Sequence, residues 1–304
     1  MKNTTTSRYM KGIMWAMLAS TLWGISGTVM QFVSQNQAIP ADWFLSVRTL
    51  SAGIILLAIG FVQRGTQIFK VFKSWALIGQ LVAYATLGLM ANMYTFYISI
   101  EKGTAAAATI LQYLSPLFIV LGTLVFKKEL PLRTDLIAFG VSLLGVFLAI
   151  TKGNIHELAI PTDALIWGIL SGVTAALYVV LPRKIVAENS PVVILGWGTL
   201  IAGILFNLYH PIWVGAPKIT PTLVTSIGAI VLIGTIFAFL SLLHSLQYAP
   251  SAVVSIVDAV QPVVTFVLSI IFLNLQVSWI EILGSLLVIV AIYILQQYRS
   301  DPLN

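Results

Sequence analysis

Residues 250–273 combine an apolar run with a stripe of side chains that can do chemistry. Asp258 lies near the middle of this run, and small or polar residues recur around it at steps of three and four. On a helix this spacing forms one lengthwise face, and a carboxylate there is costly in lipid unless it meets protein or water. Such a carboxylate can exchange a proton or bind a cationic group. The stripe consists of Ser251, Ser255, Asp258, Pro262, Thr265 and Ser269.

A similar stripe occurs 146 residues earlier, in the apolar run 103–126. Gln112 stands where Asp258 does, and Pro116 where Pro262 does. The two prolines remove backbone donors within helices and are predicted to kink them around a cavity, the alternative being a bend with no role in gating. We interpret the two runs as walls of one central pathway. The earlier stripe is Ala105, Thr109, Gln112, Pro116, Ile119 and Thr123, with Ile119 as the apolar exception.

Asp258 and Gln112 each have a functional and a structural interpretation. Buried charges in membrane spans are usually functional, so Asp258 is predicted to handle substrate or protons rather than only to hydrogen-bond neighbouring serines. Gln112 is assigned to the same pathway, although a glutamine can equally well join two helices by hydrogen bonds.

Arg48 lies within an apolar run, about 8 Å from the predicted outer end of that run. Four interpretations stay open. The side chain can extend outward to water, pair with Glu281 or Glu101, reach toward Asp258, or bind a substrate carboxylate.

Asn92, Tyr97 and His244 complete the predicted pathway because they lie near the two striped helices in the sequence-based arrangement. For the tyrosine, a place in the interfacial aromatic belt is the alternative. The chain has no cysteine, and its three histidines are scattered. No metal site and no cofactor is therefore predicted.

Composition indicates a polytopic membrane protein. Of the 304 residues, 59% are hydrophobic and 9% are charged, against about 25% charged in soluble domains. The net charge of +6 is spread over loops, so a nucleic-acid partner is not expected and the lipid bilayer is. The predicted spans are 12–33, 43–62, 74–97, 104–126, 133–151, 163–181, 191–210, 222–243, 250–273 and 278–297.

The loop charges set a predicted orientation. With the N-terminus inside, twelve lysines and arginines fall in inside segments and three in outside loops. Cytoplasmic loops of membrane proteins carry such an excess. We therefore expect both termini in the cytoplasm and the chain in the cytoplasmic membrane.

The two stripes belong to a longer internal repeat. Gly88 matches Gly234 and Asp135 matches Glu281 at the same spacing, and Thr49–Ile54 resembles Thr199–Ile204. Each copy contains five spans, and since five is odd the second copy must enter the membrane from the opposite side. The expected fold is thus all-α, ten transmembrane helices arranged as two inverted five-helix repeats, 10–151 and 162–298, an arrangement typical of alternating-access transporters.

The chain resembles the EamA-type, ten-span members of the drug/metabolite transporter superfamily over nearly its whole length. Trp23-Gly24, the stretch from Pro116 to Glu129-Leu130, and Gly140 with Gly145 carry the resemblance, and Pro262 and Gly284 echo it. It departs from the pattern at Leu275 and Ala291. The resemblance implies an inverted five-plus-five fold, cytoplasmic termini, and transport of small metabolites, with exporters of amino acids, aromatic ones included, among its members.

The leading hypothesis is a secondary transporter, acting as an exporter of a small metabolite, with protons as a candidate coupling ion. No nucleotide-binding pattern is present, so ATP does not drive it directly. An intramembrane enzyme is the rival class, but it would need paired acids, a histidine cluster or an activated serine, so the chain is not expected to be an enzyme. A non-transporting scaffold is the third class, and it has no need of an inverted repeat.

Overall fold

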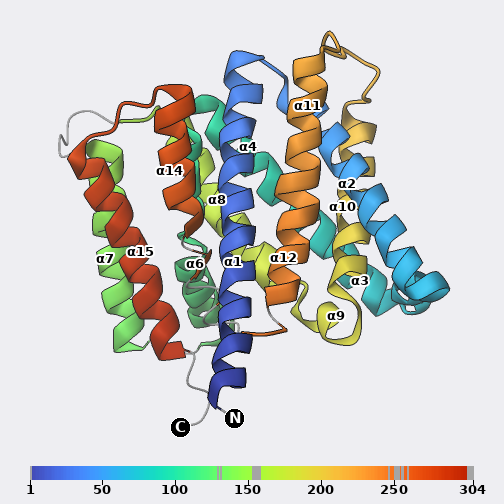
Figure 1. The fold of residues 1–304 in the computed structure, drawn as a ribbon, viewed down its shortest axis with the longest axis horizontal. Coiled ribbons are helices and arrows are strands. Elements are labelled where there is room, and N and C mark those ends of the chain that lie inside the picture. The colour runs from blue at the N-terminus through green and yellow to red at the C-terminus, as the bar shows by residue number, and fades with distance from the viewer. Residues whose placement is uncertain are drawn as a thin grey trace.

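The structure is a computed structural model, and it describes residues 2–128, 130, 132–152, 159–245, 247–249, 254, 257–258 and 260–299. Every regular element in these residues is a helix (Figure 1). The elements are α1 (Lys2–Gln31), η1 (Phe32–Asn36), α2 (Ala41–Arg64), η2 (Gly65–Lys73), α3 (Trp75–Ala83), η3 (Tyr84–Met90), α4 (Ala91–Lys102), α5 (Ala105–Gln112), α6 (Ser115–Gly122), η4 (Thr123–Lys127), α7 (Arg133–Thr151), α8 (Thr162–Val180), α9 (Arg183–Glu188), α10 (Pro191–Tyr209), α11 (Pro221–Ala229), η5 (Ile230–Phe237), α12 (Ala238–Ser245), α14 (Val260–Leu273) and α15 (Trp279–Arg299).

Continuous helices long and apolar enough to cross a membrane number eight in the described residues, and two shorter apolar helices accompany them. The protein is therefore an all-α membrane protein of about ten helices, which confirms the predicted fold class. The predicted ninth span is described mainly from Val260 onward. The eight are 10–36, 41–73, 75–102, 105–126, 133–151, 162–186, 191–209 and 221–245, and the shorter two are 260–273 and 279–291.

Helix starts follow from local sequence. The hydroxyl of Thr104 accepts a hydrogen bond from the Ala107 amide (3.1 Å) at the start of α5, and Thr220 caps α11 in the same way. Pro191 and Pro221 occupy first helical positions, where a missing N–H costs nothing. These residues let each new span begin within a few residues of a turn.

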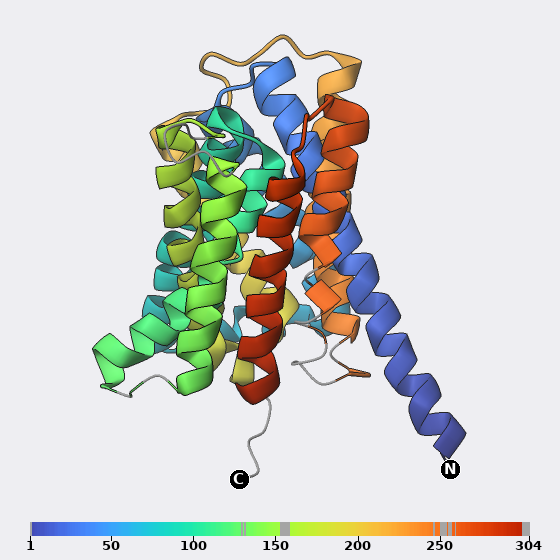
Figure 2. The ribbon, with the colours of Figure 1, turned by 90° about the vertical axis from the view of Figure 1, so that its left-hand side faces the viewer.

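The two halves of the chain run in opposite directions. Helix α1 begins, and α15 ends, at one end of the bundle, which we call the termini end (Figures 1 and 2). Helix α7 ends and α8 begins at the opposite end, which we call the far end (Figure 2). The first half therefore starts at the termini end and the second half at the far end.

Two helices of the first half pack along their counterparts in the second half. Helix α2 packs along α10, and α7 along α15. Helix α1 packs against α12 and α14, while its counterpart α8 packs against α4 and α5. The same scheme of neighbours thus occurs in both halves, with the polar elements α1, α4, α5, α8, α12 and α14 contacting one another.

The crossing of α2 and α10 is reciprocal at the level of single residues. A Cβ atom added to Gly53 would lie 2.6 Å from the amide nitrogen of Leu200, and one added to Gly203 would lie 2.7 Å from that of Leu50. Only glycine permits such an approach of two backbones. The two segments that match in the sequence, 49–54 and 199–204, therefore contact each other in the structure.

Two π-helical segments occupy equivalent places in the third and eighth spans. Segment η3 contains Gly88, which faces the backbone of Tyr178, and η5 contains Gly234, which faces Ser26. Widened turns of this kind occur frequently at functional sites. Sequence periodicity did not predict them.

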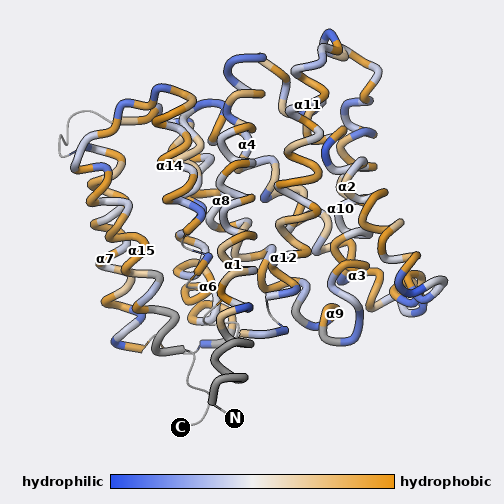
Figure 3. The backbone as a smooth tube through the Cα atoms, viewed as in Figure 1, coloured by the Kyte–Doolittle hydropathy of each residue, from blue (hydrophilic) through white to orange (hydrophobic). Residues whose placement is uncertain are grey.

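The outer surface of the bundle is apolar. Hydrophobic residues follow the helices through the middle of the molecule, and hydrophilic ones gather toward the turns at its two ends (Figure 3). Large side chains such as Trp75 and Phe126 are each 88% exposed. Such a belt fits a multi-pass protein surrounded by lipid.

Candidate transport pathway

Asp258 lies at a junction of three spans. The Ser20 hydroxyl, buried on α1, is 3.0 Å from Oδ1 of Asp258 and 2.9 Å from the carbonyl oxygen of Ala16. The hydroxyl of Tyr113, between α5 and α6, donates to the backbone oxygen of Asp258 (2.6 Å). Asp258 thus joins the ninth span to the first and the fourth.

This geometry suits a carboxyl group that changes its protonation state. A serine has one donor hydrogen and two acceptor lone pairs. Ser20 can donate that hydrogen to the Asp258 carboxylate, or turn it to the Ala16 carbonyl and accept from a protonated carboxyl. Both protonation states of Asp258 then keep a hydrogen bond within the same two helices.

Gln112 occupies the equivalent position in the first half and forms a neutral cluster. Its Nε2 atom donates to Oγ of Ser171 on α8 (3.1 Å) and approaches Oδ1 of Asn92 on α4 (3.4 Å). Asn92 in turn donates to the Ser171 carbonyl (3.2 Å). Thr95 and Thr174 extend the cluster with a 3.0 Å contact between their hydroxyls. The structure therefore brings Gln112 and Asn92 together.

The fourth span is interrupted between these two clusters. Helix α5 ends at Gln112, residues 113–114 form a turn, and α6 begins at Ser115 with Pro116 in its first turn. The break turns Tyr113 toward the ninth span. Pro262 lies buried in the first turn of α14, and residues 255–256 and 259 before it lie outside the described part.

The far end of α1 is tied to the turn between α4 and α5. Oε1 of Gln31 accepts from the Ala105 amide (2.7 Å), and its Nε2 donates to Gln35 (3.0 Å). Gln35 donates to the carbonyl oxygens of Gly103 (2.7 Å) and Ile100 (2.9 Å). These bonds join the first span to the third and fourth at one end only, which makes them a candidate closure of the pathway.

Arg48 is buried rather than extended to water. It is 9% exposed, and Nη1 contacts the sulfur of Met30 on α1 (3.2 Å). Its Nε atom has no hydrogen-bond partner. Tyr97, another predicted pathway residue, stacks on Phe44 with ring centroids 4.7 Å apart and donates its hydroxyl hydrogen to the Ile39 carbonyl (3.0 Å). The expectation that Arg48 reaches outward to water is therefore wrong.

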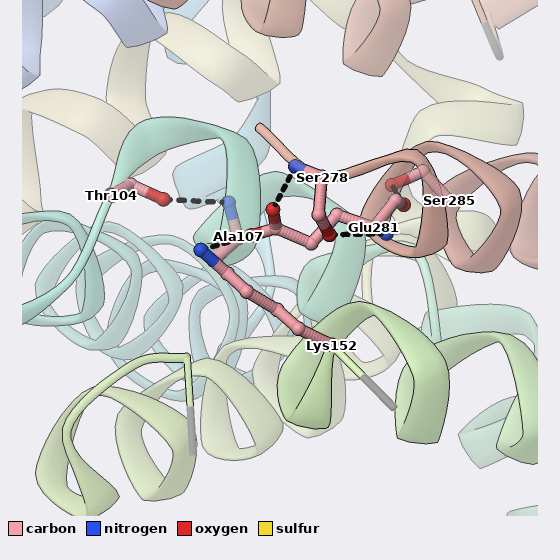
Figure 4. Close-up of polar contacts among 6 residues, drawn as sticks. All are labelled: Thr104, Ala107, Lys152, Ser278, Glu281 and Ser285. Carbon is pink, nitrogen blue, oxygen red and sulfur yellow. Dashed lines mark hydrogen bonds and ion pairs between the residues drawn. The ribbon is translucent and has the colours of Figure 1, made fainter. Parts of the chain in front are cut away.

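The acids expected near Arg48 lie elsewhere. Oε1 of Glu281 is 3.3 Å from Nζ of Lys152 (Figure 4). Oε2 of Glu281 accepts from the Ser278 amide (2.7 Å) at the start of α15, so this acid is occupied at the α7–α15 pair. Glu101 is exposed at the end of α4. The predicted pairing of Arg48 with Glu281 is therefore wrong, because Lys152 holds that acid.

Two further predicted site residues are His244 and Ser255. His244 on α12 packs edge-on against Trp15 (4.8 Å between ring centroids) and Tyr248 (5.1 Å). Ser255 lies outside the described residues. Sequence reasoning missed four further residues of the candidate site, because a lone serine or glutamine in a span carries no signal until its partner is known. They are Ser20, Ser171, Gln31 at the end of α1 and Gln35 in η1.

The sequence pattern of the EamA-like transporter family matches residues 10–151 and again residues 162–296. The two matches cover most of the chain. The chain belongs to the EamA-like transporter family. It is thus a membrane transporter. The buried polar clusters and the paired halves described above are therefore features of a transporter fold.

Several proteins that are similar to this EamA-like transporter are themselves named as transporters. It is 29% identical to the uncharacterized inner membrane transporter YicL of Salmonella typhimurium over 285 residues, 94% of this chain and 95% of that one. It is 25% identical to an uncharacterized transporter of Archaeoglobus fulgidus, over 94% of this chain and 99% of the other. A protein of known crystal structure shares the fold with a TM-score of 0.61 at 14% identity, covering 98% of this chain and 99% of that one.

Proposed function

We propose that this EamA-like transporter is a secondary transporter that exports a small polar or amphipathic metabolite across the cytoplasmic membrane. Amino acids, including aromatic ones, are the first candidates because the family resemblance includes their exporters. The repeats 10–151 and 162–298 move against each other in alternating access, both termini face the cytoplasm, and the chain performs no chemical reaction on its substrate.

The reciprocal packing of the two oppositely directed halves carries this proposal. Each polar cluster joins helices in a matched way: Asp258 bonds to Ser20 on α1, and Gln112 bonds to Ser171 on α8, the counterpart of α1. Inverted repeats that share a polar interface near mid-depth allow one fold to open to either side of the membrane. An enzyme or a scaffold has no requirement for this duplication.

Asp258 is proposed as the coupling group. It differs from Gln112 in the one property that matters for coupling, since a carboxyl titrates and an amide does not. Proton binding at Asp258 changes the charge at the junction of the first, fourth and ninth spans, so it can bias which side opens. The driving force is then the proton gradient.

A cross-linking experiment tests alternating access. The natural chain has no cysteine, so paired substitutions need no prior removal of thiols. Gln35→Cys with Gly103→Cys places thiols at the closure between α1 and the α4–α5 turn. Joining them with a short bis-thiol reagent in proteoliposomes is expected to stop flux of the metabolites that the wild type moves, and reductive cleavage to restore it.

The two single-cysteine variants serve as controls, because each reacts with the reagent at one thiol and forms no cross-link between α1 and the α4–α5 turn. Adding the reagent should leave the flux of each single variant unchanged, whatever its basal rate. Undiminished flux in the cross-linked double variant would contradict movement at this end. Failure of the wild-type protein to move any metabolite in a broad screen would contradict transport itself.

A further inference from the structure

The guanidinium of Arg48 is a buried cation without a protein counter-ion among the described residues. The ion pairs in this part of the chain are Lys102 with Asp163 and Lys152 with Glu281. Of its donor atoms, Nη1 meets only a thioether sulfur, a weak acceptor, and Nε meets none. A buried charge left in this condition is costly, and an anion that reached it would relieve that cost.

The described residues that Arg48 contacts are uncharged. It lies beside an apolar cluster that includes Met30, Phe44 and Tyr97, and the Tyr97 hydroxyl hydrogen is already used. Ser26 lies one turn along α1 from Met30, and its hydroxyl packs against Gly234 of η5, where it is buried without a hydrogen-bond partner. A second unused donor thus lies about 6 Å further along α1, toward the middle of the membrane.

Asp258 is too distant to neutralise Arg48. Arg48 contacts α1 at Met30, and Asp258 contacts the same helix at Ser20. Ten residues of helix correspond to about 15 Å. The amino and carboxyl groups of one α-amino acid are bonded to the same carbon, so a single amino acid cannot occupy both positions at once.

We propose that Arg48, with the hydroxyl of Ser26, binds the carboxylate of a small monoanionic substrate, and that an amino group is not required for recognition. The assignment rests on the proposed transport function for its physiological meaning. A planar guanidinium matches a carboxylate with two parallel hydrogen bonds. One cation in neutral surroundings balances one negative charge, so a dianion such as a phosphate monoester leaves net charge in the membrane and binds less well.

Thermal unfolding of the purified protein tests the site with defined probes at constant ionic strength. The probes are 3-phenylpropionate, its amide 3-phenylpropionamide, phenylalanine and phenyl phosphate. We expect 3-phenylpropionate to raise the unfolding temperature at least as much as phenylalanine does, and the amide and phenyl phosphate to have little effect. Equal shifts with the acid and the amide, or no shift with the acid, would overturn the proposal.

Variants connect the shift to Arg48. Arg48→Gln should abolish the shift produced by 3-phenylpropionate, whereas Arg64→Gln, an exposed arginine on the same helix, should keep it. Arg48→Lys retains the charge but loses the planar fork, so about tenfold weaker binding is expected. Ser26→Ala should weaken binding less, and it provides a second test should Arg48→Gln fail to fold. An unchanged shift in both Arg48→Gln and Ser26→Ala overturns the site.

Flux in proteoliposomes separates this site from the proposed function. If 3-phenylpropionate binds through Arg48 but crosses no membrane, the site stands and the transport proposal fails for this substrate class. If it crosses at the same rate, with the same concentration dependence, in Arg48→Gln, transport stands and the carboxylate site is wrong.

Discussion

Ser20 donates a hydrogen bond to the carboxylate of Asp258 across 238 residues of sequence. The bond joins the first span of the chain, in one repeat, to the ninth span of the chain, in the other repeat. Its counterpart joins Gln112 to Ser171 between the fourth and sixth spans. The two halves therefore use the same framework of helices to hold one group that titrates and one that does not.

Replacing Ser20 tests whether this hydrogen bond serves proton coupling. Ser20→Ala removes the donor to Asp258 and leaves the helix intact, so transport is expected to change its pH dependence. Ser171→Ala removes the corresponding partner of Gln112 and is the matched control. It should alter the rate without altering the pH dependence, because Gln112 cannot bind a proton. The flux of the wild type and both variants is measured from about pH 5.5 to 8. If the pH profiles of the wild type and Ser20→Ala are identical, the Ser20–Asp258 hydrogen bond has a structural role only.

Close approach of α2 and α10 predicts a stability effect at Gly53. In Gly53→Ala the new methyl group meets the Leu200 backbone, so the helices must separate and unfolding should become easier by about 1–3 kcal/mol. Gly140→Ala on α7 is the control, since nothing lies within 4 Å of an added Cβ there. That variant should be neutral or slightly stabilised because alanine favours helix. Thermal unfolding in detergent measures both, and equal stability of the two variants would contradict the packing described here.

Removal of the unpaired charge of Arg48 should stabilise the ligand-free protein. Arg48→Gln replaces a buried cation that has no counter-ion among the described residues by a neutral side chain. The expected gain is about 1–3 kcal/mol in the free energy of unfolding. Arg64→Gln changes an exposed arginine on the same helix and should leave the unfolding temperature nearly unchanged. A marked loss of stability in Arg48→Gln would indicate that the protein itself compensates this charge.

The predicted orientation has a direct chemical test. Single cysteines at Asn36, at the end of η1, and at Pro217, both at the far end, should react with a membrane-impermeant maleimide added to intact cells. A cysteine at Thr66, just beyond the other end of α2, should react only after the membrane is permeabilised. The reverse pattern would place the termini outside and contradict the distribution of lysine and arginine in the loops.

Sequence alone predicted the all-α class and the number of helices because hydrophobic runs depend only on local composition, whereas the orientation derived from the loop charges stays a prediction. It also drew attention to Asp258 and Gln112, since a polar residue on a helical face is visible without knowing its neighbours, and their role in transport stays a prediction. It could not assign Glu281 to Lys152 or Ser20 to Asp258, because depth along a span does not say which helices touch. The π-helical segments around Gly88 and Gly234 were missed for a similar reason, since backbone widening depends on packing and leaves no periodic pattern.

The most direct test of the central claim is flux driven by an imposed pH gradient in proteoliposomes of the wild type and Asp258→Asn. The substitution is nearly isosteric and keeps an acceptor for Ser20, so insertion and yield should be preserved. The wild type is expected to accelerate transport when the gradient is applied, and Asp258→Asn to show the same rate with and without it. Gln112→Ala, as a control, should retain the response to the gradient whatever its basal rate. If Asp258→Asn responds to the gradient as strongly as the wild type, Asp258 is a structural hydrogen-bonding residue and the proposed coupling is wrong.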